Sequence, residues 1–129
     1  PADAQLAKAL TAANVARTAA GAKPLAWSQP LANVALRHSQ DMADHDYFDH
    51  TNPAGQSPFD RMKAAGISYG TAAENIAQNF SDSGDEVIQQ WLNSPGHRAN
   101  MLEPAFGKMG LGVVTAADGA KYWTQAFTD

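Results

Sequence analysis

Residues 109–127, Met-Gly-Leu-Gly-Val-Val-Thr-Ala-Ala-Asp-Gly-Ala-Lys-Tyr-Trp-Thr-Gln-Ala-Phe, decide the fold class. Residues 109–114 alternate between two faces, which is the period of a β-strand. Asp118-Gly119 is a strong signal for a two-residue hairpin turn. Residues 121–127 alternate again, with Tyr122, Thr124 and Ala126 on one side and Trp123, Gln125 and Phe127 on the other. The stretch predicts an antiparallel β-hairpin.

The residues before this hairpin have mainly helical spacing. Residues 3–20 carry apolar residues and Arg17 on one side and stop at Gly21. In Ser83-Gly84-Asp85-Glu86, a capping box is predicted, with Glu86 reaching back to the Ser83 amide. Short segments at 67–69 and 73–77 could be extended. Further helices are predicted from Ser28 to about residue 45, from Ser57-Pro58 to Gly66, and from Ser83 and Ser94 onward.

Helices over the first two-thirds and a hairpin at the end predict an α+β fold, a small antiparallel sheet covered by helices. The 129 residues suit a single domain over 1–129. No apolar run approaches the roughly 20 residues of a membrane span. The net charge of -4 and scattered basic residues argue against a nucleic-acid partner. The chain has no cysteine, which excludes disulfides and thiolate chemistry.

The first two histidines have plain structural interpretations. His38 lies in the middle of a predicted helix on its apolar face, which favours a core histidine over a cleft residue. His45 lies where the same helix frays, which favours a solvated cap.

The other two histidines are candidates for function. His50 follows Tyr47-Phe48-Asp49 and precedes the turn at 51–55, in irregular backbone where binding residues concentrate. A functional role is favoured there over a turn-stabilising hydrogen bond. His97, three residues after Ser94, could be a metal ligand or general base, or could pack against Trp91.

Glu74 lies in the apolar stretch 72–77, where a carboxylate is costly unless a histidine or a cation pairs with it. His50, Glu74 and His97 could together bind Zn²⁺, or a harder cation with water completing the shell. Glu86 is better explained by the capping box, and Ser94 by a helix cap. No HExxH, EF-hand, P-loop, GxGxxG or GxSxG pattern is present.

An ordered set of short motifs resembles the bacterial, cysteine-free branch of the CAP superfamily, whose domain is also called SCP-like. The motifs extend from about residue 6 to residue 127. In chain order they are Asn14…Arg17…Gly21, Pro24-Leu25-Ala26-Trp27, His38-Ser39…Met42-Ala43, residues 47–55, Ser57-Pro58-Phe59-Asp60-Arg61-Met62, Ala65-Gly66, Glu74-Asn75-Ile76-Ala77, residues 91–102, Gly110-Leu111-Gly112-Val113 and Tyr122-Trp123-Thr124-Gln125.

The resemblance implies a three-layer α-β-α sandwich with an open cleft, and a secreted, cell-surface or periplasmic location. Eukaryotic members carry two histidines and two acidic residues in the cleft, a tetrad that can bind a divalent metal. His50 and Glu74 match one histidine and one acid, although Ala73 replaces the usual glycine. Ser94 and Tyr122 stand at the other two positions.

His97 is therefore a hypothetical replacement for the missing imidazole. His50, Glu74 and His97 are the predicted catalytic and metal residues, with zinc as the candidate cofactor. The remaining predicted cleft residues are Ser94, Tyr122, Asn75 and Glu86.

Three functions follow from the resemblance and the residues. The favoured one is an exported binding module for a small apolar or lipid-like ligand, or for a cell-surface partner. The alternative is a metal-assisted or His/Glu-based hydrolase of peptide or cell-wall bonds, with Glu74 as general base. The third is a scaffold whose loops carry its function.

Overall fold

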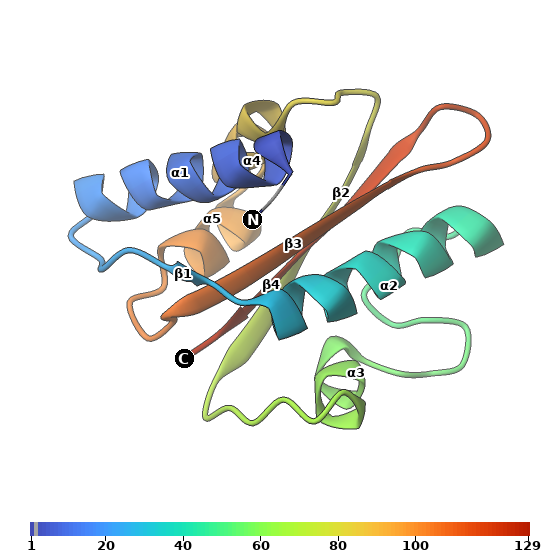
Figure 1. Cartoon of the computed structure of the whole chain (residues 1–129), viewed down its shortest axis with the longest axis horizontal. Coiled ribbons are helices and arrows are strands. Elements are labelled where there is room, and N and C mark those ends of the chain that lie inside the picture. Colours follow the sequence, from blue (N-terminus) through green and yellow to red (C-terminus); the bar gives the residue numbers. More distant parts are fainter. Residues whose placement is uncertain (2) are drawn as a thin grey trace.

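A computed structural model describes residues 1 and 3–129 of the chain as helices packed on a four-stranded sheet (Figure 1). Asp3, Ser28, Ser57 and Ser83 cap helix starts with their side chains. The elements are α1 (Ala4–Ala19), β1 (Ala26–Trp27), α2 (Gln29–His45), α3 (Pro58–Ala64), β2 (Ala72–Asn79), α4 (Gly84–Leu92), α5 (Pro95–Leu102), β3 (Lys108–Thr115) and β4 (Lys121–Thr128).

The sheet has the strand order β1-β3-β4-β2. β3 and β4 form the antiparallel hairpin predicted from the sequence, and β2 pairs antiparallel with the other side of β4. The two-residue β1 runs parallel to β3. This short parallel pair is an addition to the antiparallel sheet predicted from the sequence.

Helices cover both faces of the sheet, which confirms the three-layer α-β-α architecture (Figure 1). α2 and α3 lie on one face, and α1, α4 and α5 lie on the other. The alternation predicted for β4 is confirmed: Ala126 packs with α2 and α3 residues, whereas Trp123 and Phe127 belong to the core under α1, α4 and α5. β2 forms one edge of the sheet, so a residue there can meet groups from both layers.

The backbone of α2 approaches β3 closely because β3 carries two glycines. A Cβ atom on Gly110 would lie 2.1 Å from the amide nitrogen of Ala32, and one on Gly112 would lie 2.4 Å from Cα of Leu36. Such contacts leave no room for a side chain. The two glycines of β3 therefore set how closely α2, the helix that carries His38, packs against the sheet.

Of the two segments that could be extended, residues 73–77 lie in β2, and residues 67–69 belong to no strand. Two local predictions are wrong in detail. The β3–β4 connection spans residues 116–120 rather than two residues, with Gly119 at φ 88°. The Ser83 hydroxyl does accept from the Glu86 amide, but the Glu86 carboxylate bonds to the Ser81 hydroxyl instead of the Ser83 amide. Ser83 N–H donates to Ser81 Oγ, so the amide that Glu86 would have bound is already paired.

Candidate functional site

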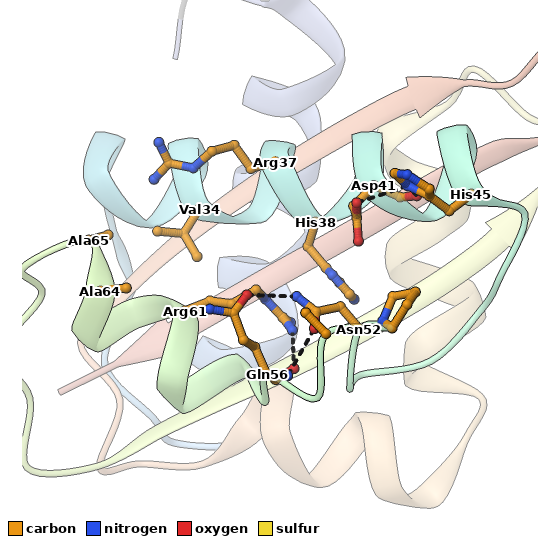
Figure 2. Close-up of a pocket in the computed structure, with 12 residues that line it drawn as sticks. Val34, Arg37, His38, Asp41, His45, Asn52, Gln56, Arg61, Ala64 and Ala65 are labelled. Carbon is orange, nitrogen blue, oxygen red and sulfur yellow. Dashed lines mark hydrogen bonds and ion pairs between the residues drawn. The ribbon is translucent and has the colours of Figure 1, made fainter.

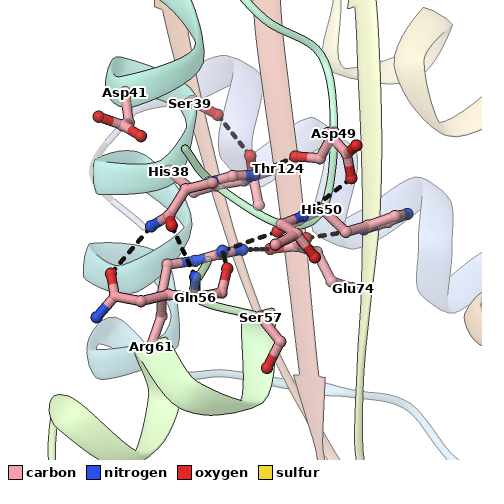
Figure 3. Close-up of polar contacts among 12 residues, drawn as sticks. His38, Ser39, Asp41, Asp49, His50, Gln56, Ser57, Arg61, Glu74 and Thr124 are labelled. Carbon is pink, nitrogen blue, oxygen red and sulfur yellow. Dashed lines mark hydrogen bonds and ion pairs between the residues drawn. The ribbon is translucent and has the colours of Figure 1, made fainter. Parts of the chain in front are cut away.

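Three segments bring His50, Arg61 and Glu74 together at the edge of the sheet (Figure 3). His50 lies in the loop after α2. Arg61 lies in α3, whose start is fixed by a reciprocal capping box between Ser57 and Asp60. Glu74 lies on edge strand β2. The sequence predicts that Glu74 needs a partner, and the structure gives it two, a histidine and a cation.

Both carboxylate oxygens of Glu74 are engaged. Oε2 accepts from Nδ1 of His50 at 2.8 Å, and Oε1 accepts from Nη2 of Arg61 at 2.9 Å. The side chains of Glu74 and Arg61 are 3% and 10% exposed, whereas that of His50 is 46% exposed. The cluster is thus a buried ion pair that presents one imidazole to solvent.

Arg61 also fixes the backbone of the loop that carries His50. Its Nη1 donates to the carbonyl oxygens of His50 and Gln56, at 2.8 and 3.0 Å. The planar guanidinium can satisfy these carbonyls and a carboxylate at once, which an ammonium group cannot do with the same geometry. One residue therefore positions both the ring and the main chain of His50.

The hydrogen bond to Glu74 raises the pKa of His50 above its ordinary value of 6.5, and the charge of that carboxylate acts in the same direction. Partial burial opposes the shift. Because Nδ1 donates to Glu74, Nε2 is the ring nitrogen left for other partners, and the side chain is partly exposed. Among the described residues, Nε2 of His50 has no hydrogen-bond partner.

The contribution of His50 to stability is expected to be larger in acid than in weak alkali. Because its folded pKa is raised, this contribution is fully present below the unfolded pKa of about 6.5 and is lost as pH rises through the folded pKa. The difference in unfolding free energy between wild type and His50→Gln, measured in urea, should be larger at about pH 5.5 than at about pH 8.5. An equal or opposite difference would contradict the shift.

His97 and Ser94 form a second polar pair beside this cluster. Nδ1 of His97 lies 2.9 Å from the Ser94 hydroxyl. Ser94 is the N-cap residue of α5, as predicted, but its hydroxyl bonds to the His97 ring and not to a backbone amide of the helix. Burial lowers the pKa of His97, and the charge of His50 lowers it further. The two imidazoles therefore lie within electrostatic reach.

The CAP family model, described as the cysteine-rich secretory protein family, matches residues 10–127. The chain belongs to the CAP family. It is 45% identical over 120 residues to the uncharacterized protein YkwD of Bacillus subtilis, an alignment that covers 93% of this chain and 45% of YkwD.

Two solved structures place this CAP domain among similar folds. An extracellular protein of Bacillus anthracis that contains an SCP domain superposes with a TM-score of 0.86 at 35% identity, covering 96% of this chain and 40% of that one. An outer surface protein of Borrelia burgdorferi superposes with a TM-score of 0.89 over 100% of this chain and 95% of its own, with 19% identity, which shows a shared fold. The chain spans less than half of YkwD and of the Bacillus anthracis protein.

The other predicted cleft residues of this CAP domain lie elsewhere. Asn75 is buried, where its amide donates to the His97 carbonyl and to Gln125, so it ties β2 to α5. Tyr122 is buried in a core cluster and accepts from Gln78. Glu86 is exposed on α4 and bonds to Ser81. None of these three side chains forms a hydrogen bond with His50.

The two remaining histidines of the CAP domain both lie on α2. His45 is largely exposed and pairs with Asp41 one turn earlier, as expected of a solvated residue at a helix end. His38 is 1% exposed, as expected of a core histidine. Its Nε2 donates to the carbonyl oxygen of Asp49 at 2.8 Å and so anchors the loop just before His50.

The predicted metal residues of the CAP domain are only partly free. Among residues 1 and 3–129, no group of three or more His, Asp or Glu side chains is arranged to hold a metal ion. Glu74 uses both oxygens and His97 uses Nδ1 in the bonds described above. His50 and His97 each use only Nδ1, whereas Glu74 would have to give up one of its two bonds to ligate a zinc ion, so that site stays a prediction.

Arg61 is a functional residue to which the sequence alone assigns no role. The sequence indicates that Glu74 needs a partner, and Arg61 and Lys63 are the two basic residues between His50 and Glu74. Their position in the sequence therefore makes them candidates for the cation that pairs with Glu74. Arg61 falls on the inner side of a short helix, whereas Lys63 is exposed. A helical projection of residues 58–64 places Arg61 and Lys63 on different sides of the helix and so distinguishes them.

Proposed function

We propose that this CAP domain is an exported binding module that presents His50, held by Glu74 and Arg61, to a polar component of a cell surface. The observation that supports this is the double engagement of Glu74, which leaves its carboxylate as a positioning group and His50 Nε2 as the outward group. An imidazole with a raised pKa favours ligands that carry anionic or hydrogen-bond-accepting groups. This favours a polar cell-surface partner over a small apolar or lipid-like ligand.

An exported location is supported by the family and by two of the relatives. The Bacillus anthracis protein is called extracellular and the Borrelia protein is called an outer surface protein. None of the helices described combines the length and apolar character needed to cross a bilayer. A cell-surface component is the kind of partner that an exported domain meets.

Co-sedimentation with purified peptidoglycan sacculi tests the proposal. Wild-type binding is expected to fall between about pH 5.5 and about pH 8.5, as the imidazole loses its charge. His50→Ala is expected to bind about tenfold or more weakly at the lower pH, because a charge-assisted hydrogen bond is lost. Thr51→Ala, the neighbouring exposed residue, is the matched control and should bind normally. Equal binding by His50→Ala and wild type would overturn the proposal.

The hydrolase alternative is supported by one feature, the carboxylate bonded to Nδ1 of His50, since this is how a general base is commonly oriented. Zinc titration by calorimetry on wild type, His50→Ala and Glu74→Ala bears on its metal-assisted form. Zinc heat that is lost in both variants, together with release of soluble fragments from peptidoglycan or casein, would favour hydrolysis. No heat with any divalent ion would remove the metal-assisted form.

A further inference from the structure

A hollow lies beside the loop that follows His50. It has a volume of about 730 Å³ and is lined by one side of α2, by residues 52–56 and by α3 (Figure 2). Among the described residues that line it are His38 and Arg61, but not His50 or Glu74. This volume lies within the range of pockets that bind small molecules. We call it the α2–α3 groove.

Two buried polar atoms belong to the residues at the floor of the groove. Nδ1 of His38 and Nε of Arg61 are both buried, and neither has a hydrogen-bond partner among the described residues. Figure 2 shows the two side chains extending into the space between α2 and residues 52–56. A buried polar group without a hydrogen-bond partner is unfavourable, so a ligand that pairs with these two atoms removes that cost.

The chemistry of the two atoms defines the group that would satisfy both. Nε2 of His38 donates to the Asp49 carbonyl, and burial lowers the pKa of the ring, so Nδ1 is an acceptor. Nε of Arg61 is a donor. A hydroxyl group can donate to the first and accept from the second. A carboxylate could accept from Arg61 but would meet the lone pair of His38 with its own, and an apolar group would satisfy neither atom.

The rest of the groove has the mixed character that a sugar ring requires. Asp41, Asn52 and Gln56 supply acceptors and donors along its length, and the side-chain amide nitrogen of Gln56 is not among the donors used within the described chain. Val34, Pro53 and three alanines supply apolar surface between them. A pyranose offers hydroxyl groups at its rim and C–H groups on its faces, so it matches both kinds of surface.

From this arrangement we infer that the α2–α3 groove is a saccharide-binding site, in which a ligand hydroxyl bridges Nδ1 of His38 and Nε of Arg61. The site is separate from the one proposed at His50, although Arg61 contributes to both. Occupation of the groove brings a ligand atom to the same guanidinium that holds Glu74. Saccharide binding is therefore expected to reach the environment of His50 through Arg61.

The test is an NMR titration of the whole chain with maltotriose and, separately, with chitotriose. At least one of them is expected to shift backbone amides of α2, residues 52–56 and α3, and to shift the Nδ1 resonance of His38 and the Nε–H resonance of Arg61. The ring and guanidinium resonances report the bridging hydroxyl directly, and triglycine serves as a ligand of similar size without hydroxyl groups.

Matched variants on α3 locate the site. Ala64 lines the groove and is exposed, so Ala64→Trp fills the space without disturbing the core, and it should weaken binding by about tenfold or more. Lys63→Trp places the same ring at the adjacent exposed position outside the lining and should bind as wild type. Because peptidoglycan also contains saccharides, binding to sacculi is measured for Ala64→Trp beside His50→Ala. Loss in only one of the two variants shows which site binds, so either proposal can fail alone.

Three results would overturn the inference. The first is that neither trisaccharide shifts resonances of the groove at saturating concentration. The second is that Ala64→Trp binds as tightly as wild type. The third is that triglycine binds in the groove and the saccharides do not, which would assign it to peptides.

Discussion

Glu74→Ala is expected to lower the free energy of unfolding by about 3–5 kcal/mol, because it leaves the guanidinium of Arg61 buried without its counter-charge. Arg61 is 10% exposed and cannot rotate to water without breaking its bonds to the His50 and Gln56 carbonyls. The loss should appear as a lower urea midpoint with an unchanged slope. Glu86→Ala, at an exposed glutamate, should cost much less.

A double-mutant cycle separates the ion pair from simple loss of packing. Glu74→Ala/Arg61→Ala should cost less than the sum of the two single substitutions, because the second removes the unpaired charge that the first creates. The expected coupling is about 1–3 kcal/mol. Strictly additive losses would show that Glu74 and Arg61 do not depend on one another.

Arg17→Met is expected to lose about 4 kcal/mol or more of unfolding free energy, since hydrogen bonds to charged groups contribute about 1.5–3 kcal/mol each. Arg17 is fully buried, and its guanidinium donates to four carbonyl oxygens at 2.8–2.9 Å. They belong to Lys23, Met101, Glu103 and Phe106.

Methionine can fill part of the space but cannot donate to any of these carbonyls, and those of Met101 and Phe106 would lose this partner in a buried place. Two of them lie at or just after the end of α5, so amide hydrogen exchange should rise around residues 101–106 as well. Lys8→Met, at an exposed position of α1, is the control for loss of a cation. A near-normal midpoint for Arg17→Met would contradict the assigned role.

The arrangement of the fold could largely be predicted from local pattern. The alternation of side chains between two faces in residues 109–114 and 121–127 predicts the hairpin and the two faces of β4. This is possible because the alternation is a local property of an extended chain. The length of the turn could not be predicted in the same way. The β3–β4 loop is longer than Asp118-Gly119 suggests, since the pairing stops at Thr115 and Lys121.

The sequence could predict the site only where a buried polar group requires a partner. A carboxylate at residue 74 in an apolar strand requires a partner, and His50 is that partner. A helical projection distinguishes Arg61 from Lys63, but the bonds of Arg61 to Glu74 and to the His50 carbonyl depend on how α3 approaches β2, which no local pattern reports. The family pattern places Tyr122 and Asn75 in the cleft, whereas strand alternation and tertiary packing direct them into the interior.

Arg17 illustrates the same limit in the opposite direction. Its place on the apolar side of a predicted helix is visible from spacing, yet an arginine at such a position gives no hint of its four acceptors. These lie at residues 23 and 101–106, brought together by the packing of α1 against α5. A cationic residue on the apolar side of a predicted helix therefore indicates that a buried polar network exists, but it does not identify the residues that form it.

Proton NMR titration of the His50 ring, in wild type and in Glu74→Gln, determines whether a buried carboxylate holds this imidazole. We expect a wild-type midpoint above 6.5 that falls toward or below 6.5 when the carboxylate becomes a neutral amide. The same midpoint in both proteins, or a wild-type midpoint below 6.5, would show that Glu74 does not hold the ring in its charged form.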